Sequence, residues 1–593
     1  MKMPTDQTTC KRAAPAGLRV ALRDHLARFR AEDRGGMVIF SLFIFVAMMM
    51  VAGLAIDFMR YEMTRTQFQN TVDRAVLAAA SLEQKQDPEA VVKDYFLKAG
   101  LGDFLGPVDV QETESSGTVS FRRVSALTGA TLSPIFLSYV GMDEMPITAY
   151  SVAEEGISDL EISLVLDVSG SMGNKSSSGY SKVYELREAA KDFTYHMQCN
   201  PNASRNSGEA CSVEDGKVSI SIVPYAEQVT VGKTLLDQFN VTQEHAASHC
   251  VTFDEDEFTS AAIDPTVLIK RTGHFDYNNS ASRSPSSFVC LTDKWREIKP
   301  LMYDYHDVYD AIDALRASGW TSIDLGMKWG AALLDPAAQS VVTALTSTAV
   351  APGSTETVVN TAFDGRPYDY DQAYNMKVVI LMTDGENTYQ HYLKDAYRDG
   401  PSVVWHYRKA DGSLGDDVYS VYNASRNQYR WVDEDGDDFN SNWQDDVYIG
   451  EASQTCGYEQ VRYRTWWGTY YRTEWVCNPT GAPDGVAYQL TYPEVWAKFT
   501  TRWFSDFWWL EDPQTDYDQS DKDDHLADIC AAAKSEDILV YTIGFEIGEG
   551  SHSESVMKSC ATTRNHYFPA DGVNLGDVFS AIASSINQLR LTE

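Results

Sequence analysis

Residues 161–172 read EISLVLDVSGSM, and their pattern is the clearest indication of a fold in this chain. Its first six residues alternate between polar and apolar and then become continuously apolar, which predicts a strand. The strand runs directly into Asp167-Val168-Ser169-Gly170-Ser171, a D-x-S-x-S motif. Residues 182–197 then have the pattern of a helix. A strand, a polar loop and a helix in this order form the first unit of an alternating α/β domain.

Three more apolar stretches predict further strands: KVSISIVPY at 217–225, KVVILMTDGEN at 377–387 and DILVYTIGF at 537–545. Helical patterns follow Thr321 and occupy residues 525–534 and 575–589. This alternation predicts an α/β fold of the Rossmann-like kind, with a doubly wound, mostly parallel sheet. Two long inserts interrupt the sheet, at about 230–318 and 388–518. Both leave the sheet near the edge that holds the D-x-S-x-S motif, so they are expected to form a rim or a cap.

Hydroxyl and carboxylate side chains gather at the carboxyl ends of these strands. Asp167 and Asp384 each end a strand, and Thr321 lies in the loop GWTSIDLG just before a helix. Because ligands of such sheets bind at this edge, the three segments are expected to converge there. Ser169 and Ser171 add two hydroxyls, and hard oxygen donors of this kind suit Mg²⁺, or Ca²⁺ or Mn²⁺. A purely structural alternative is that Asp167 and Ser169 cap the next helix and that TDG is only a turn.

These motifs resemble the metal-ion-dependent adhesion site of von Willebrand factor A domains. The resemblance implies that Ser169, Ser171 and Thr321 bind one metal ion through hydroxyls, and that Asp167 and Asp384 bind it directly or through water. It also implies a protein partner that donates a carboxylate. The alternatives are a metal-dependent hydrolase on the same residues, or an A-domain sensor or transport scaffold unrelated to pili. The sequence contains no P-loop, G-x-G-x-x-G, H-E-x-x-H or G-x-S-x-G motif, so binding is expected rather than catalysis.

Residues 37–56 read MVIFSLFIFVAMMMVAGLAI, 20 residues without a charge. This length is sufficient to cross a bilayer core of about 30 Å. Seven Lys and Arg residues between positions 11 and 34 precede the apolar run and predict a cytoplasmic N-terminus and an external body. A cleaved secretory signal is the alternative, but the apolar run is longer than the usual core of such a signal. The pattern of residues 61–79 predicts that the helix continues beyond the membrane.

The segment 34–81 resembles the N-terminus of TadE/TadG-like proteins of the tight-adherence (Flp) pilus system. The matching stretches are DRGGMVIF, GLAIDFMR and QFQNTVDRAVLAAAS. Processed pilin-like members carry a Glu five residues into the mature helix, and cleavage after Gly36 would place Ser41 there. The resemblance implies a single-pass protein of the bacterial inner membrane, with its body in the periplasm or outside the cell and pilus or surface components as partners. The expected domains are residues 1–36 (cytoplasmic), 37–81 (pilin-like helix), 82–155 (an α+β connector) and 156–593 (the A domain with its inserts).

The net charge of −36 is unevenly distributed. Residues 1–36 hold eight Lys or Arg and four Asp or Glu, a balance of +4, which leaves −40 for the rest of the chain. Such an acidic body excludes nucleic acid as a partner and attracts divalent cations.

Eight of the nine cysteines follow the apolar run, and an even number outside the cytoplasm predicts disulfides rather than buried free thiols. The spacings favour four local pairs: Cys199–Cys211, Cys250–Cys290, Cys456–Cys477 and Cys530–Cys560.

The second insert holds ten of the 13 tryptophans, between Trp405 and Trp509. These aromatic side chains are expected to form a small core of the insert, and recognition of a peptide or glycan is the alternative. The acidic run 433–438 resembles a Ca²⁺ loop, but its glycine is misplaced for an EF-hand, so a solvated turn is expected.

Overall fold

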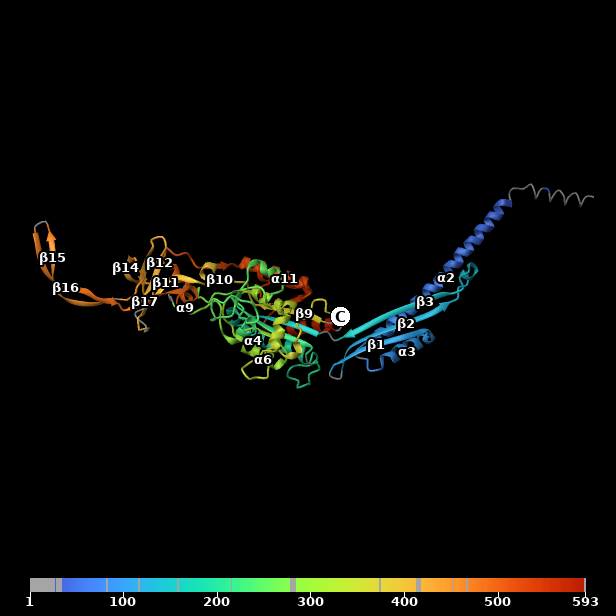
Figure 1. The fold of residues 1–593 in the computed structure, drawn as a ribbon. Coiled ribbons are helices and arrows are strands. Elements are labelled where there is room, and N and C mark those ends of the chain that lie inside the picture. The colour runs from blue at the N-terminus through green and yellow to red at the C-terminus, as the bar shows by residue number, and fades with distance from the viewer. Residues whose placement is uncertain are drawn as a thin grey trace, which may run out of the picture. The chain divides into compact units, whose positions relative to one another are not determined.

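The computed structural model describes Ala27 and residues 35–81, 84–115, 118–156, 159–214, 216–277, 284–372, 375–411, 417–450, 452–465 and 468–590. The chain divides at residue 157 into two compact units. Figure 1 shows both units in the colours of the chain.

The first unit is a long helix packed on a three-stranded sheet. Helix α2 (Gly35–Ala80) has an exposed apolar first half and a second half that covers the sheet. The expected continuation of the helix is confirmed, because Phe68, Val72 and Val76 are buried at spacings of four residues. The sheet is antiparallel in the order β1-β2-β3. Helix α3 lies between α2 and β1 in the sequence and packs into the core that α2 and the sheet share. Their bounds are α3 (Pro88–Lys98), β1 (Leu105–Ser115), β2 (Thr118–Leu132) and β3 (Met145–Gly156).

Within the described residues, one helix is long and apolar enough to cross a membrane by length and composition. It is α2, and its apolar first half corresponds to residues 37–56.

The second unit contains a six-stranded sheet in the order β20-β19-β9-β4-β5-β8. The first five strands of this order run parallel, and only β8 at the edge is antiparallel. The α/β fold class is therefore confirmed, with β4 near the centre of the sheet. The bounds are β4 (Asp159–Asp167), β5 (Val218–Tyr225), β8 (Lys299–Met302), β9 (Asn375–Thr383), β19 (Leu539–Phe545) and β20 (Tyr567–Ala570).

Helices cover both faces of this sheet. One face packs against α4, α6 and α13, and the other packs against α7, α8, α11 and α12. Helix α6 and strand β8 lie within the range expected for the first insert, yet they belong to these layers. The bounds are α4 (Lys182–Gln198), α6 (Tyr305–Ala314), α7 (Ile323–Ala332), α8 (Gln339–Thr346), α11 (Gln519–Ser535), α12 (His552–Cys560) and α13 (Leu575–Arg590).

Helix α7 approaches the sheet closely because it carries two glycines one turn apart. A Cβ atom at Gly330 would lie 2.4 Å from a methyl of Val165, and one at Gly326 would lie 2.6 Å from the ring of Tyr225. Any larger residue would hold α7 away from β4 and β5. The close contact fixes the position of the loop that precedes α7, which contains Thr321.

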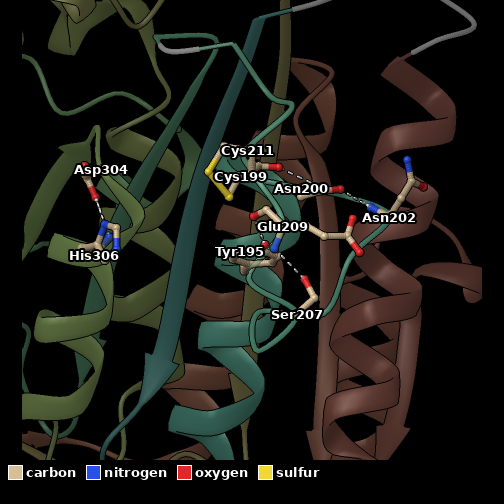
Figure 2. The surroundings of a disulfide bond; sticks show 10 residues. Tyr195, Cys199, Asn200, Asn202, Ser207, Glu209, Cys211, Asp304 and His306 are labelled. Carbon is tan, nitrogen blue, oxygen red and sulfur yellow. Dashed lines mark hydrogen bonds and ion pairs between the residues drawn. A yellow bond between two sulfur atoms is a disulfide. The ribbon is translucent and has the colours of Figure 1, made fainter.

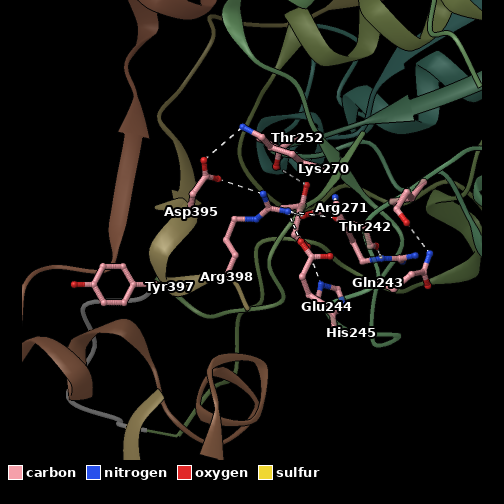
Figure 3. Close-up of polar contacts among 12 residues, drawn as sticks. Thr242, Gln243, Glu244, His245, Thr252, Lys270, Arg271, Asp395, Tyr397 and Arg398 are labelled. Carbon is pink, nitrogen blue, oxygen red and sulfur yellow. Dashed lines mark hydrogen bonds and ion pairs between the residues drawn. The ribbon is translucent and has the colours of Figure 1, made fainter. Parts of the chain in front are cut away.

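The first insert contains little regular structure: α5 (Lys233–Leu236) and the short pair β6 (Val251–Thr252) and β7 (Lys270–Arg271). It packs against the second insert through the charged cluster in Figure 3. The guanidinium of Arg398 pairs with Glu244 and donates to the carbonyl oxygen of Arg271 at 2.8 Å. Lys270 also lies 3.7 Å from Asp395. The two inserts are thus held together rather than standing as separate units.

The second insert begins and ends with the paired strands β10 (Gln390–Leu393) and β18 (Gln514–Tyr517). Between them lie a five-stranded sheet in the order β14-β13-β12-β11-β17, the hairpin β15–β16 and two short helices. The bounds are β11 (Pro401–Lys409), β12 (Tyr419–Asn423), β13 (Gln428–Val432), β14 (Asp438–Gln444), β15 (Ala452–Thr465), β16 (Gly468–Pro483), β17 (Gly485–Thr491), α9 (Tyr492–Lys498) and α10 (Thr501–Ser505).

The tryptophans of this insert have two environments. Trp496 and Trp503 are buried in an aromatic core beside Phe499 and Phe504, as the core interpretation predicts. Trp475 on the hairpin and Trp508 are exposed, so the core accounts for only part of the aromatic content. Residues 433–437 of the acidic run form the turn between β13 and β14, as expected, and Asp438 begins β14.

Three of the four expected disulfides are confirmed: Cys199–Cys211, Cys250–Cys290 and Cys530–Cys560. Figure 2 shows the first of these in the loop after α4, where Asn202 N donates to Asn200 Oδ1 at 3.0 Å. Cys456 and Cys477 are opposite one another in the register of β15 and β16, but their side chains lie outside the described part of the structure.

Candidate metal centre

The two predicted carboxylates lie next to each other because β4 and β9 are neighbouring parallel strands. Leu166 pairs with Met382, so Asp167 at the end of β4 lies beside Thr383 at the end of β9, with Asp384 one residue further. One oxygen of Asp167 accepts a hydrogen bond from Ser169 N and the other accepts one from the Thr383 hydroxyl, each at 2.8 Å.

A chain of hydroxyls connects the D-x-S-x-S loop to the second carboxylate. The Ser169 and Ser171 hydroxyl oxygens are 2.9 Å apart. The Ser171 hydroxyl then donates to Asp384 Oδ1 at 2.6 Å. Four of the five residues predicted from the sequence therefore form one hydrogen-bonded network from Asp167 to Asp384, through the Ser169 amide and the two serine hydroxyls.

The loop of Thr321 reaches the same edge through its backbone. Gly170 N donates to Gly319 O at 2.8 Å, which joins this loop to the D-x-S-x-S loop. Thr321 N donates to the Thr388 hydroxyl at 2.8 Å, which joins it to the loop after β9. Among the described residues, the network of the other four site residues does not include the Thr321 hydroxyl.

Burial and mutual repulsion make the two carboxylates an unfavourable pair in the absence of a cation. Asp167 is fully buried, and burial, followed by the charge of Asp384, raises its pKa from 3.8 to about 6. Its two hydrogen-bond donors, Ser169 and Thr383, are neutral. An uncompensated negative charge in this position is the condition that a bound cation relieves.

Sequence reasoning missed an intrinsic counter-ion. The ammonium of Lys182, the first residue of α4, lies 2.9 Å from Asp384 Oδ2 and 3.8 Å from Glu546 Oε2. The only sequence signal was a basic residue at the start of the helix that follows the motif. Burial acts to raise the pKa of Glu546, but hydrogen bonds from Ser177 and Gly572 and the charge of Lys182 outweigh it and lower the pKa.

A second missed lysine positions the loop of Thr321. Lys522 on α11 is fully buried, and its ammonium donates to Thr321 O at 2.7 Å, to the Ser322 hydroxyl at 2.6 Å and to Thr388 O at 2.9 Å. Burial lowers the pKa of Lys522 to about 8. Asn387 adds a further tie, since its Oδ1 accepts from Ile323 N at 2.8 Å.

The side chains present fit a hard divalent cation. The oxygens of Asp167, Asp384, Ser169 and Ser171 are donors of the type that Mg²⁺, Ca²⁺ and Mn²⁺ prefer. The described residues contain no cluster of three or more His, Cys, Asp and Glu side chains that could hold a metal ion. The candidate site is not a cluster of that kind, because it contains only two carboxylates, and its other oxygen donors are neutral hydroxyls.

Comparison with protein families finds a match at the N-terminal end of the chain. The profile of the Tad family, Flp pilus-assembly TadE/G-like proteins, matches residues 35–82. This match confirms the resemblance of the N-terminal segment, which is a small part of the chain. No curated protein matches the chain.

Two solved structures of the type V pilus tip protein Mfa5 from Porphyromonas gingivalis are similar to this chain. The von Willebrand factor domain of Mfa5 is 14% identical, with a TM-score of 0.28, over 73% of this chain and 96% of that domain. A structure of its three N-terminal domains is also 14% identical, with a TM-score of 0.27, over 81% of this chain and 56% of that one. At these values the likeness is distant.

Proposed function

We propose that this chain is a membrane-anchored pilus-assembly or surface-adherence protein that binds a protein partner through a divalent cation. The match of residues 35–82 to a pilus-assembly family and the apolar first half of α2 support the pilus context and the anchor. The basic residues before the apolar run favour a cytoplasmic N-terminus. The three disulfides of the body favour a periplasmic or extracellular location, where thiols are oxidised.

We assign the cation, Mg²⁺ or Ca²⁺ or Mn²⁺, to Asp167, Ser169, Ser171 and Asp384, with Thr321 on the adjoining loop. The observation that carries the assignment is the network from Asp167 to Asp384, in which a buried carboxylate with a raised pKa lies beside a second carboxylate. Capping of the following helix does not explain it, because Ser169 makes no side-chain cap bond and α4 begins only at Lys182.

When bound, the cation supplies a positive centre that can accept a carboxylate oxygen from a partner. The residues of the site keep that centre underneutralised, since Ser169 and Ser171 are neutral donors and Lys182 already offsets part of the charge of Asp384. The remainder of the chain is strongly acidic. An acidic partner is repelled by this body except at the cation, so binding becomes dependent on the metal.

The test measures Mg²⁺ binding by isothermal titration calorimetry on the full-length chain in lipid nanodiscs. Wild type is expected to bind Mg²⁺, and the Asp167→Ala, Asp384→Ala double variant is expected to lose that binding. The Glu434→Ala, Asp435→Ala variant is a matched control, because it removes two exposed carboxylates from the acidic turn and leaves the site intact. Equal binding in all three proteins would refute the assignment.

A further inference from the structure

Near the end of its apolar run, α2 contacts a loop that is distant in the sequence. The contact site on α2 consists of Gly53 and Asp57 and is called the socket below. A Cβ atom at Gly53 would lie 2.4 Å from the ring of Phe136, so the absence of a side chain there makes room for the ring. One turn further, the fully buried carboxylate of Asp57 accepts three backbone N–H bonds, from Ile135 at 2.9 Å, Phe136 at 2.7 Å and Leu137 at 2.8 Å.

These contacts define the pinned loop, residues 133–144 between β2 and β3, which contains the 3-10 turn η2 (Leu137–Val140). The three donors of the loop are 78 to 80 residues away from Asp57 in the sequence. A buried carboxylate is costly unless its oxygens are hydrogen-bonded, and here both oxygens are satisfied by the loop. The contact therefore specifies where the loop lies along α2, beside the last turn of the apolar segment 37–56.

Most apolar side chains of the pinned loop are exposed. Only Pro134 and Leu137 of this loop are buried. The exposed fractions are 53% for Ile135, 37% for Phe136, 82% for Tyr139, 58% for Val140 and 48% for Met142. Such a gathering of apolar side chains on a surface marks a binding face. It lies against α2 where that helix is itself exposed and apolar, as at Phe58 and Met59.

We propose that the pinned loop is a second membrane-contacting element, whose apolar side chains enter the lipid interface beside the exit of α2. The proposal rests on the anchor role of α2 stated above. The apolar run ends at Ile56, so the socket at Gly53 and Asp57 lies at the level of the interface. Tyrosine is favoured at that level because its ring is apolar and its hydroxyl is polar, which suits Tyr139.

Two contacts with the bilayer restrict the orientation of the first unit more than a single helix does. A lone helix can rotate about its axis and tilt, because length and hydropathy do not determine either angle. A loop fixed to one side of the helix by Asp57 gives that side a preferred depth in the lipid. The sheet formed by β1, β2 and β3 is thereby presented to the outside in one orientation.

The test uses the full-length chain in phosphatidylethanolamine–phosphatidylglycerol vesicles, with the photoreactive residue benzoylphenylalanine in place of Met49, Tyr139 or Tyr150, one at a time. Lipid adducts detected by mass spectrometry are expected at positions 49 and 139 and not at 150. Tyr150 is a matched control because it is also an exposed tyrosine of this unit, at 56%. Its carbonyl oxygen accepts from Gln69, 12 residues beyond Asp57 on α2, which is about 18 Å further from the membrane along the helix axis.

Each result supports or overturns the proposal. A lipid adduct at 49 with none at 139, or a cross-link at 139 to a second copy of the chain, overturns the role of the loop and leaves the anchor standing. No lipid adduct at 49 refutes the anchor and the loop with it. In an Asp57→Ala background, the adduct at 139 is expected to fall severalfold while that at 49 is unchanged. An undiminished adduct at 139 in that background would overturn the pinning by Asp57.

Discussion

Replacing Lys182 with methionine tests the metal centre directly, because its ammonium pairs with the Asp384 carboxylate, which is a proposed ligand of the cation. The nitrogen lies 2.9 Å from Asp384 Oδ2 and 3.8 Å from Glu546 Oε2, and the side chain is only 12% exposed. Methionine keeps the unbranched stem of lysine and removes the charge. If the site binds a divalent cation, the ammonium of Lys182 competes with it for the Asp384 carboxylate.

The distance sets the size of the expected effect. Two unit charges 2.9 Å apart interact by about 6 kcal/mol at an effective dielectric constant of ~20, before their lost hydration is subtracted. Measured net values run from below ~1 kcal/mol for exposed pairs to ~3–5 kcal/mol for loss of one partner of a buried pair. For this partly buried pair we expect Lys182→Met to lower the free energy of unfolding of the metal-free protein by roughly 1–3 kcal/mol. Relief of competition at Asp384 is expected to tighten Mg²⁺ binding by about tenfold, which corresponds to ~1.4 kcal/mol.

Two measurements read out these opposite effects. Calorimetric titration with Mg²⁺ gives the affinity, and thermal unfolding in EDTA and in saturating Mg²⁺ gives the stability. The Lys182→Met protein is expected to melt below wild type in EDTA and to regain most of the difference in Mg²⁺, because a ligand bound only to the folded state stabilises it. Lys175→Met is the matched control, since it removes an exposed charge from the loop that precedes α4. If Lys182→Met binds Mg²⁺ no more tightly than Lys175→Met, the ammonium and the cation do not share Asp384 and the reasoning is wrong.

Three other outcomes follow from buried groups. Because burial raises the pKa of Asp167 from 3.8 to about 6, the folded metal-free protein retains a proton that the unfolded chain has released. Its unfolding free energy should fall by about 3 kcal/mol as the pH rises from about 4 to above 6, and chemical denaturation of Asp167→Asn should show no such fall. Gly330→Ala should cost ~1–3 kcal/mol in thermal melts although alanine favours helices, whereas Gly576→Ala, with open space at its Cβ, should not destabilise. The disulfide Cys530–Cys560 joins residues 30 positions apart, and the double variant Cys530→Ser, Cys560→Ser should lower the free energy of unfolding by at most about 3–4 kcal/mol. A reductant should then shift the melting temperature of this variant less than that of wild type.

The sequence alone predicted the elements that depend on local patterns. The apolar runs at 161–166 and 377–383 became β4 and β9, and the pattern after Thr321 became α7. Periodicity is a local signal, so it reports strands and helices wherever burial is regular. Parallel strands place their carboxyl ends at one edge, so the strand pattern predicts Asp167 and Asp384 at the same edge. That β4 and β9 are neighbours there is decided by the tertiary structure.

Contacts between charged groups far apart in the chain left no such signal. Lys182 reaches Asp384 across 202 positions, and Lys522 reaches the carbonyl oxygen of Thr321 across 201. Asp57 directly follows the apolar run 37–56, and its partners are backbone groups of a loop about 80 residues away. A single charged residue has no period and no fixed spacing to its partner. Its role is decided by which surfaces pack together, because only packing removes the water that would otherwise solvate it.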